Sequence, residues 1–238
     1  RPIEDHFDKS YELEDTLDKK GKTDMNTLII NAQPDYKNDA HYSIQLMNHF
    51  IGLFKEKYPN DTLEIRNLAG EWIPRATMDE LLTVRGKQIA KKPLTEQEEK
   101  VAQRTDELLN DFMSFHRIVI VMPLHNFNIP SILKDYMDNI LVARKTFKYT
   151  PEGLAGLMTD DRRVLLLQAS GSIYTNNDRY SSFEFSRMYL DTVFTQVMGF
   201  DSFQIVRAQG TSKSAWKAER DMPLALGKLD EEFTRFYA

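Results

Sequence analysis

The chain alternates between short apolar runs and longer segments in which apolar residues recur every three or four positions. Five apolar runs have the length and β-branched content of buried strands: 27–32, 62–68, 117–122, 162–169 and 203–208. Six segments have helical spacing: 40–58, 78–91, 95–115, 131–143, 183–198 and 213–236. This alternation predicts an α/β domain with a doubly wound five-stranded parallel sheet and helices on both faces.

The first 24 residues do not follow this pattern. They contain eight acidic and five basic side chains and stop at Met25, which resembles an ordinary start. Ile3, Phe7 and Tyr11 form only a weak apolar stripe, so the segment is either an arm on the body or on a partner subunit, or a solvated extension. We therefore expect an N-terminal extension at 1–24 and one domain at 25–238.

Composition excludes several classes of function. A net charge of −5 gives no general attraction for nucleic acid, and no apolar stretch approaches the roughly 20 residues of a membrane span. Cysteine is absent, which removes disulfides and thiolate chemistry and is typical of a reducing, cytoplasmic location. The five histidines show no ligand-type spacing, so we expect no metal site.

The loops that follow the strands carry the candidate chemistry, because ligands of such sheets bind outside the carboxyl ends of the strands. After the first strand, His41, Tyr42 and Ser43 lie at the expected start of a helix, where free N–H groups and a hydroxyl suit a phosphate. Taken alone, a serine in the first turn of a helix is more often only a structural cap. The chain lacks GxGxxG and GxxxxGK[ST] patterns, which excludes a dinucleotide fingerprint or a P-loop.

The loop after the third strand reads MPLHNFNIP, residues 122–130. Its prolines stiffen both ends, and Asn126 can offer an amide donor and acceptor to the rim of a heterocycle, beside the flat surfaces of His125 and Phe127. After the fourth strand, Gly171 in QASGSIYTNN allows close approach to the backbone. Each loop alone is compatible with a plain turn, but the presence of all three after strands of one sheet predicts a binding site for a flat, phosphorylated cofactor.

Three segments resemble one known family. MPLHNFNIPSILKDYMD, ARKTFKYTPEG and QASGSIY are similar to the FMN-dependent NAD(P)H azoreductase and quinone reductase family, which has a flavodoxin-like fold, and the likeness runs from about Met25 to the C-terminus. The most specific elements are P-x-x-N-F-N-[IV]-P and T-F-x-Y-T-x-x-G. The resemblance implies a homodimer with FMN and the active site at the interface. It also implies a ping-pong reaction in which NADH or NADPH donates two electrons that pass to quinones, azo compounds or nitroaromatics, all small planar substrates.

The resemblance also assigns site residues. The phosphate loop of the family falls on Gln33, His41, Tyr42 and Ser43, the flavin-edge loop on Leu124, His125, Asn126 and Phe127, and the last loop on Ala169, Ser170, Gly171 and Ser172. Tyr149 matches an aromatic position that faces the active site in relatives, so His125, Phe127 and Tyr149 are the candidate catalytic residues, as walls of a stacking slot.

The chain departs from the family at several positions. His125 stands where relatives usually have Tyr or Trp, Gly171-Ser172 replaces Gly-Gly, and Asn31-Ala32-Gln33 replaces Lys-Ser-Ser. His125 either makes acceptor reduction depend on pH or is simply packed in its loop. A flavin-binding electron carrier or redox sensor reduced by a partner protein is the alternative function, and a binding module that has lost FMN is a third.

Overall fold

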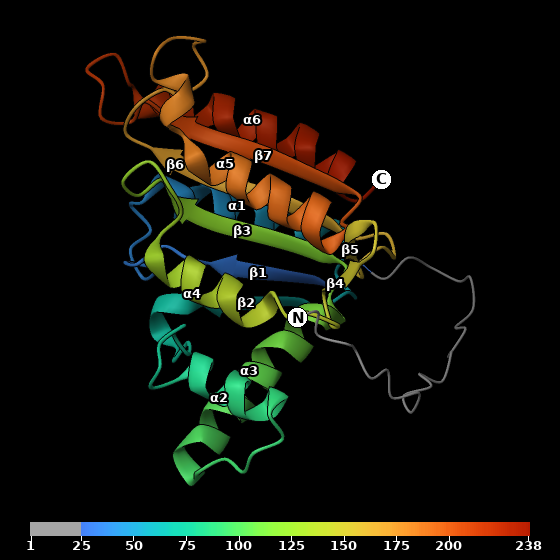
Figure 1. Ribbon diagram of the computed structural model, residues 1–238. Helices are drawn as coiled ribbons and strands as arrows, with labels where there is room; N and C mark the ends of the chain where they lie inside the picture. Colours follow the sequence, from blue (N-terminus) through green and yellow to red (C-terminus); the bar gives the residue numbers. More distant parts are fainter. Residues whose placement is uncertain (1–24) are drawn as a thin grey trace.

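The computed structural model of the protein describes residues 25–238, so the extension expected at 1–24 lies outside the described residues (Figure 1). Five strands form one sheet in the order β2-β1-β3-β6-β7, and all neighbouring pairs are parallel. The strands are β1 (Thr27–Asn31), β2 (Leu63–Asn67), β3 (Arg117–Pro123), β6 (Arg163–Ser170) and β7 (Ser202–Gln209). The predicted five-stranded parallel sheet is confirmed, and the strand order reverses between β1 and β3.

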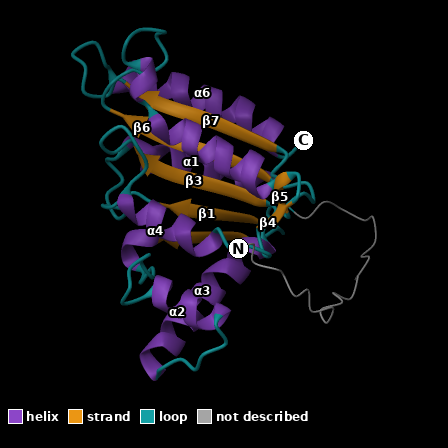
Figure 2. Cartoon of the chain, viewed as in Figure 1, coloured by secondary structure: helices purple, strands orange, loops and turns teal. Residues whose placement is uncertain are grey.

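Helices cover both faces of the sheet (Figure 2). Ile118 and Ile120 pack against one set of helices and Val119 and Val121 against the other, all with no exposed surface, because alternate residues of a strand face opposite sides. One face carries α1 (Tyr42–Lys57) and α6 (Ala218–Phe236); the other carries α3 (Glu96–Ser114), α4 (Ser131–Ile140) and α5 (Phe185–Asp191). Burial on both faces explains why the strands read as continuous apolar runs.

The helix at 96–114 begins as the sequence predicts. Thr95 Oγ1 accepts a hydrogen bond from the N–H of Glu98, and the Glu98 carboxylate accepts one from the N–H of Thr95, which completes a capping box. A shorter helix, α2 (Leu81–Ile89), precedes it and contacts it. Short 3₁₀ turns occur at η1 (Leu68–Gly70) and η2 (Ser181–Phe183).

Two features differ from the sequence prediction. The helix expected over 183–198 begins at Phe185 and changes at Thr192 into a π-helix, η3 (Thr192–Met198), which ends at Gly199 with φ of 90°. A two-stranded antiparallel hairpin, β4 (Phe147–Thr150) and β5 (Gly153–Gly156), was not predicted. Its strands are too short to show a periodic pattern.

The hairpin lies at the amino end of the main sheet, opposite the strand arrowheads in Figure 1. The N–H of Met158 donates to the carbonyl of Met198 at 2.8 Å, just before β7 begins. A Cβ atom on Gly156 would lie 2.5 Å from backbone atoms of Met198 and Gly199, so only glycine allows this approach. Among the helices of residues 25–238, none is long and apolar enough to cross a membrane.

Candidate functional site

Loops from four strands converge on a cavity of about 300 Å³ at the carboxyl edge of the sheet. The loops after β1 and β3 flank the place where strand order reverses, which is where ligands of open α/β sheets bind. The lining residues are Gln33, Ala40, His41, Tyr42, Ser43, Pro123, Leu124, Ala169, Ser170, Gly171 and Thr211. Eight of the positions assigned from the sequence therefore meet around one cavity: Gln33, His41, Tyr42, Ser43, Leu124, Ala169, Ser170 and Gly171.

Gln33 ties the end of β1 to the start of α1. Its Nε2 donates to the Oγ of Ser43 at 3.2 Å, and its own N–H donates to Asn31 Oδ1 at 3.1 Å. Ser43 is fully buried and lies inside the helix, so it is not the cap that the sequence left open as an alternative. Its hydroxyl accepts from Gln33 and keeps its own hydrogen to donate.

The first turn of α1 is left open toward ligands. His41 is the N-terminal flanking residue, its side chain makes no capping hydrogen bond, and the first turn holds no acidic residue. The N–H groups of a helix start have no partner within the helix and carry a partial positive charge. Because residues 40–43 line the cavity, this end of α1 is suited to an anion.

His41 is paired with a carboxylate. Its Nε2 lies 2.9 Å from Oδ2 of Asp35, and Asn38 Nδ2 donates to the same oxygen at 2.9 Å. The hydrogen bonds from His41 and then Asn38 hold the pKa of Asp35 below its ordinary value. The imidazole is therefore fixed at the mouth of the cavity by a group from the same loop.

The loop after β7 was missed in the sequence analysis. Thr211 lines the cavity, and its N–H donates to the carbonyl of Ser170 at 3.1 Å. Ser172 does not line the cavity, and its carbonyl accepts hydrogen bonds from Gly210 N–H and Ser170 Oγ. The sequence does indicate a further binding loop here, since Gly-Thr-Ser at 210–212 follows an apolar strand and so lies at the same edge of the sheet.

The segment after β3 makes a tight turn beside the cavity. His125 and Asn128 exchange backbone hydrogen bonds of 2.9 and 3.0 Å, and the two residues between them, Asn126 and Phe127, have φ of 46° and 68°. Such a two-residue turn requires left-handed backbone at both central positions, which Asn tolerates and Phe does not adopt readily. His125, Asn126 and Phe127 do not line the cavity; they follow the lining residue Leu124 along the chain.

Phe127 belongs to a group of exposed aromatic rings. Its side chain is 48% exposed, and its ring meets Phe183 edge to face with 6.0 Å between ring centroids. Phe183 in turn meets Tyr180 at 5.8 Å. Flat apolar surface therefore stands beside a cavity with polar donors, although only Phe127 was assigned from the sequence.

Tyr149 is not brought to this site within one chain. It lies on β4, its side chain is 74% exposed, and the hairpin packs at the opposite edge of the sheet. The cavity of one chain therefore contains no contribution from Tyr149.

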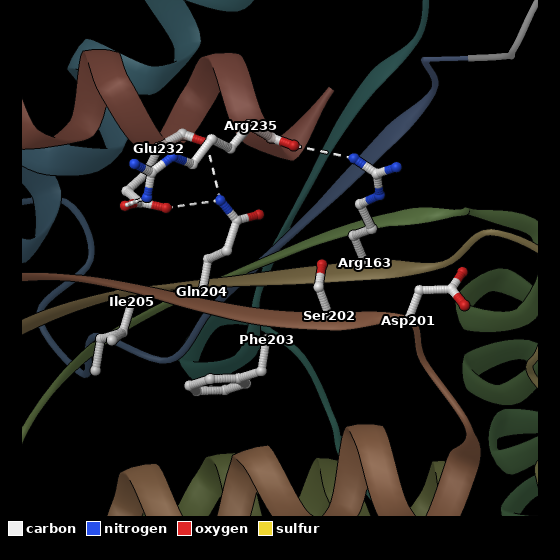
Figure 3. Close-up of a pocket in the computed structure, with 8 residues that line it drawn as sticks. All are labelled: Arg163, Asp201, Ser202, Phe203, Gln204, Ile205, Glu232 and Arg235. Atoms are coloured by element: carbon white, nitrogen blue, oxygen red, sulfur yellow. Dashed lines mark hydrogen bonds and ion pairs between the residues drawn. The ribbon is translucent and has the colours of Figure 1, made fainter. Parts of the chain in front are cut away.

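A second cavity, of about 570 Å³, follows the outer edge of β7 (Figure 3). Its polar groups bind one another: Gln204 Nε2 donates to Glu232 Oε2 at 2.7 Å, Arg235 Nη1 to Glu232 Oε1 at 3.0 Å, and Arg163 Nη1 to the Arg235 carbonyl at 2.9 Å. It holds none of the assigned residues, and β7 lies at the edge of the sheet, away from the strand reversal. The smaller cavity is the better candidate. Within residues 25–238, no cluster of three His, Asp or Glu side chains could hold a metal ion.

Comparisons with known proteins agree with this architecture. A family model described as flavodoxin-like fold matches residues 25–233. FMN-dependent NADH:quinone oxidoreductase 1 from Lactiplantibacillus plantarum is 54% identical over 211 residues, which cover 89% of this chain and 98% of that protein. FMN-dependent NADH:quinone oxidoreductase from Streptococcus agalactiae is 41% identical over 218 residues, which cover 90% of this chain and 99% of that protein.

A solved structure shows the same likeness in three dimensions. The structure of an FMN-dependent NADH-azoreductase from Bacillus anthracis, in complex with FMN, superposes with a TM-score of 0.84 at 43% identity and covers 90% of this chain and all of that one. An azoreductase from another strain of that species gives a TM-score of 0.79 at 28% identity. The chain therefore belongs to the flavodoxin-like fold family, among whose members the FMN-dependent NADH:quinone oxidoreductases are its relatives.

Proposed function

We propose that the protein is an FMN-dependent NADH:quinone oxidoreductase that also reduces azo compounds and nitroaromatics by a ping-pong mechanism. The names of its relatives support FMN as cofactor and NADH as donor, and NADPH remains a second candidate donor. The observation that carries the proposal is the convergence of three predicted loops on one cavity at the reversal of strand order.

The chemistry of the cavity fits FMN. An uncapped helix start, the hydroxyl of Ser43 and the absence of any carboxylate among the described lining residues suit a phosphate ester. A volume of about 300 Å³ is at the low end for ligand pockets, so part of the molecule has to lie outside. We assign the phosphate end to Gln33, His41, Tyr42 and Ser43, and the ring to Leu124, His125, Asn126, Phe127, Ala169, Ser170, Gly171 and Ser172.

The contribution of the protein is binding and orientation. FMN, when bound, supplies the exchange of two electrons with nicotinamide and with the acceptor. The ring of Phe127 would form a flat wall that holds aromatic substrates in contact with the ring system, an effect of proximity. The amide of Asn126 can bond the rim of the ring, and the backbone N–H of Gly171, which lines the cavity, would stabilise negative charge there. Because such a wall makes few directional bonds to a substrate, it would accept a broad range of flat electron acceptors.

A homodimer with the active site at the interface is part of this proposal. Tyr149 lies at the opposite edge from the cavity of its own chain, so it can act as a catalytic residue only if a second subunit presents it. Its 74% exposure leaves it accessible for such a contact. The expected cytoplasmic location rests on the lack of cysteine and stays a prediction.

The function is tested on the purified protein under anaerobic conditions. We expect a yellow flavin spectrum that bleaches within seconds of adding NADH or NADPH and recovers when a quinone is added. A yellow protein that ignores both nucleotides supports the electron carrier or redox sensor instead, and a protein that takes up no added FMN supports a binding module.

A pair of variants locates the site. Thr211→Trp fills the cavity and should prevent FMN uptake, whereas Thr192→Trp, on the exposed side of the π-helix, should leave FMN uptake unchanged. Equal FMN binding by both variants would show that FMN binds elsewhere.

A further inference from the structure

We propose that His41 makes recognition of the flavin phosphate depend on pH, because its protonated imidazole is the cation that binds the phosphate. The proposal rests on FMN as the ligand of the proposed function. Its consequence is a preference for FMN over riboflavin that increases as His41 takes up a proton.

The charge balance of the cavity motivates the proposal. Among the described residues that line it, there is no lysine or arginine, and His41 alone can become positively charged. A phosphate monoester carries a charge of about −1.5 to −2 at pH 7, and a helix start offers the equivalent of only about half a positive charge. The helix start alone therefore leaves much of the phosphate charge unbalanced, and protonation of His41 would offset the negative charge of Asp35 beside it.

Asp35 fixes which nitrogen can change. A carboxylate only accepts hydrogen bonds, so the 2.9 Å contact between Asp35 Oδ2 and His41 Nε2 places a hydrogen on Nε2. Asp35 is itself held by Asn38 Nδ2 and by a bond from its N–H to Gln33 Oε1 at 3.3 Å. In the neutral ring Nδ1 is therefore a hydrogen-bond acceptor, which would repel a phosphate oxygen. Protonation turns Nδ1 into a charged donor, which would attract it.

The other ionisable groups near His41 have separate contacts. Lys37 lies over the ring of Tyr36, and Asp39 accepts a bond from Asn48 of α1. The Tyr42 hydroxyl accepts from Trp216 Nε1 at 3.0 Å, across from the loop after β7. Of the ionisable groups on the loop after β1, on α1 and on the loop after β7, Asp35 is thus the charged partner of His41.

The same helix provides a matched control. His49 Nε2 lies 2.7 Å from Oδ1 of Asp230, and its side chain is 32% exposed, compared with 38% for His41. Eight residues separate the two histidines, about 12 Å along the helix, so His49 is paired alike but lies far from the cavity.

The experiment measures binding of FMN and of riboflavin to the flavin-free protein, from the quenching of flavin fluorescence, at several values between about pH 6 and about pH 8.5. At about pH 6, we expect the ratio of FMN to riboflavin affinity to be roughly tenfold or more higher in the wild type than in His41→Gln, as for a hydrogen bond to a charged group. At about pH 8.5 the two ratios should agree within about twofold. Protonation of the free phosphate near pH 6 affects every variant equally and cancels in this comparison.

Two further variants complete the test. His49→Gln should follow the wild type at each pH, and His41→Lys, which carries a permanent charge, should keep a high ratio at about pH 8.5. The role of His41 is overturned if wild type and His41→Gln have equal affinity ratios at every pH. It is also overturned if the ratio of His41→Gln is lower by the same factor at every pH. In both cases FMN still binds, so the proposed function stands. Failure of the wild type to bind FMN at any pH overturns both proposals.

Discussion

The N–H of Phe185 donates a hydrogen bond of 2.9 Å to the carbonyl of Phe127. Phe127 has φ of 68°, and a bulky residue in such backbone costs on the order of 1–3 kcal/mol. The neighbouring Glu184 is anchored, because its carboxylate is 5% exposed and pairs with Arg207 Nη2 at 3.3 Å. The start of α5 therefore holds the strained turn at Phe127 in place through this hydrogen bond.

The ring of Phe127 is expected to act on substrates and not on stability. In Phe127→Asn the turn persists, since asparagine tolerates left-handed backbone, and the melting temperature should not fall. Loss of the flat wall should lower kcat/KM for a quinone by about tenfold, as for one aromatic contact. Steady-state kinetics with thermal unfolding checks both expectations, and Leu224→Asn, on the exposed face of α6, controls for loss of an exposed apolar side chain.

The position of Tyr149 predicts complementation between subunits. Tyr149→Ala and Phe127→Asn should each be impaired as pure proteins. Mixed dimers would contain one intact site, built from the loops of one chain and Tyr149 of the other. After dissociation and random reassociation, half of the dimers are mixed and each has one intact site of two, so turnover should recover to about a quarter of the wild-type value.

The control for this experiment is a mixture that is never dissociated. Its activity should stay at the mean of the two pure variants. If the reassociated mixture also stays at that mean, Tyr149 does not complete the site of a second subunit.

Sequence patterns predicted the sheet and most of the cavity because both depend on long-range regularities. Buried parallel strands read as apolar runs, and the loops after them must meet at one edge, which brought Gln33, Leu124 and Ser170 together. The same relation applies to the loop after β7, which contains Thr211, but the sequence prediction used only the loops after β1, β3 and β6. The π-helix was missed because apolar spacing over Thr192–Met198 does not separate it from an α-helix.

The place of Tyr149 shows a different limit. Its motif indicated a role near the active site, but a motif does not say which edge of the sheet a side chain occupies or which subunit uses it. That depends on the hairpin at 147–156, whose four-residue strands are fixed by packing against the residues before β7.

The close contact at Gly156 predicts a strong effect on stability. In Gly156→Ala, the new methyl group would lie 2.5 Å from backbone atoms of Met198 and Gly199, which cannot rotate away. We expect the free energy of unfolding to fall by about 2–3 kcal/mol, as for overpacking. Gly52→Ala is the matched control: the added Cβ meets nothing within 4 Å on α1, and the protein should gain about 0.5–1 kcal/mol. Urea unfolding measures both, and equal stability of the two variants would contradict the packing of the hairpin.

The ion pair at the amino edge of the sheet predicts how stability depends on pH. Asp160 Oδ1 accepts from Arg162 Nε at 2.6 Å, and Oδ2 lies 2.9 Å from His116 Nε2. Burial alone would raise the pKa of Asp160, but the bonds and charges of Arg162 and His116 outweigh it and lower the pKa below its ordinary 3.8. A carboxyl whose pKa is lower in the folded state stabilises the fold above its unfolded pKa. That contribution is lost as the pH falls through 3.8 toward the folded value.

Asp160→Asn therefore has two expected effects. The melting temperature should drop near neutral pH, where the carboxylate of the wild type is charged and bound to Arg162. The further decline between about pH 5 and about pH 3 should be shallower than in the wild type, because the variant has no proton to take up at this position. Asp106→Asn, on the exposed face of α3, should leave the slope unchanged. Parallel slopes for wild type and Asp160→Asn across the acid range would show that this ion pair does not contribute to stability, since linkage requires the two curves to converge as the carboxylate is protonated.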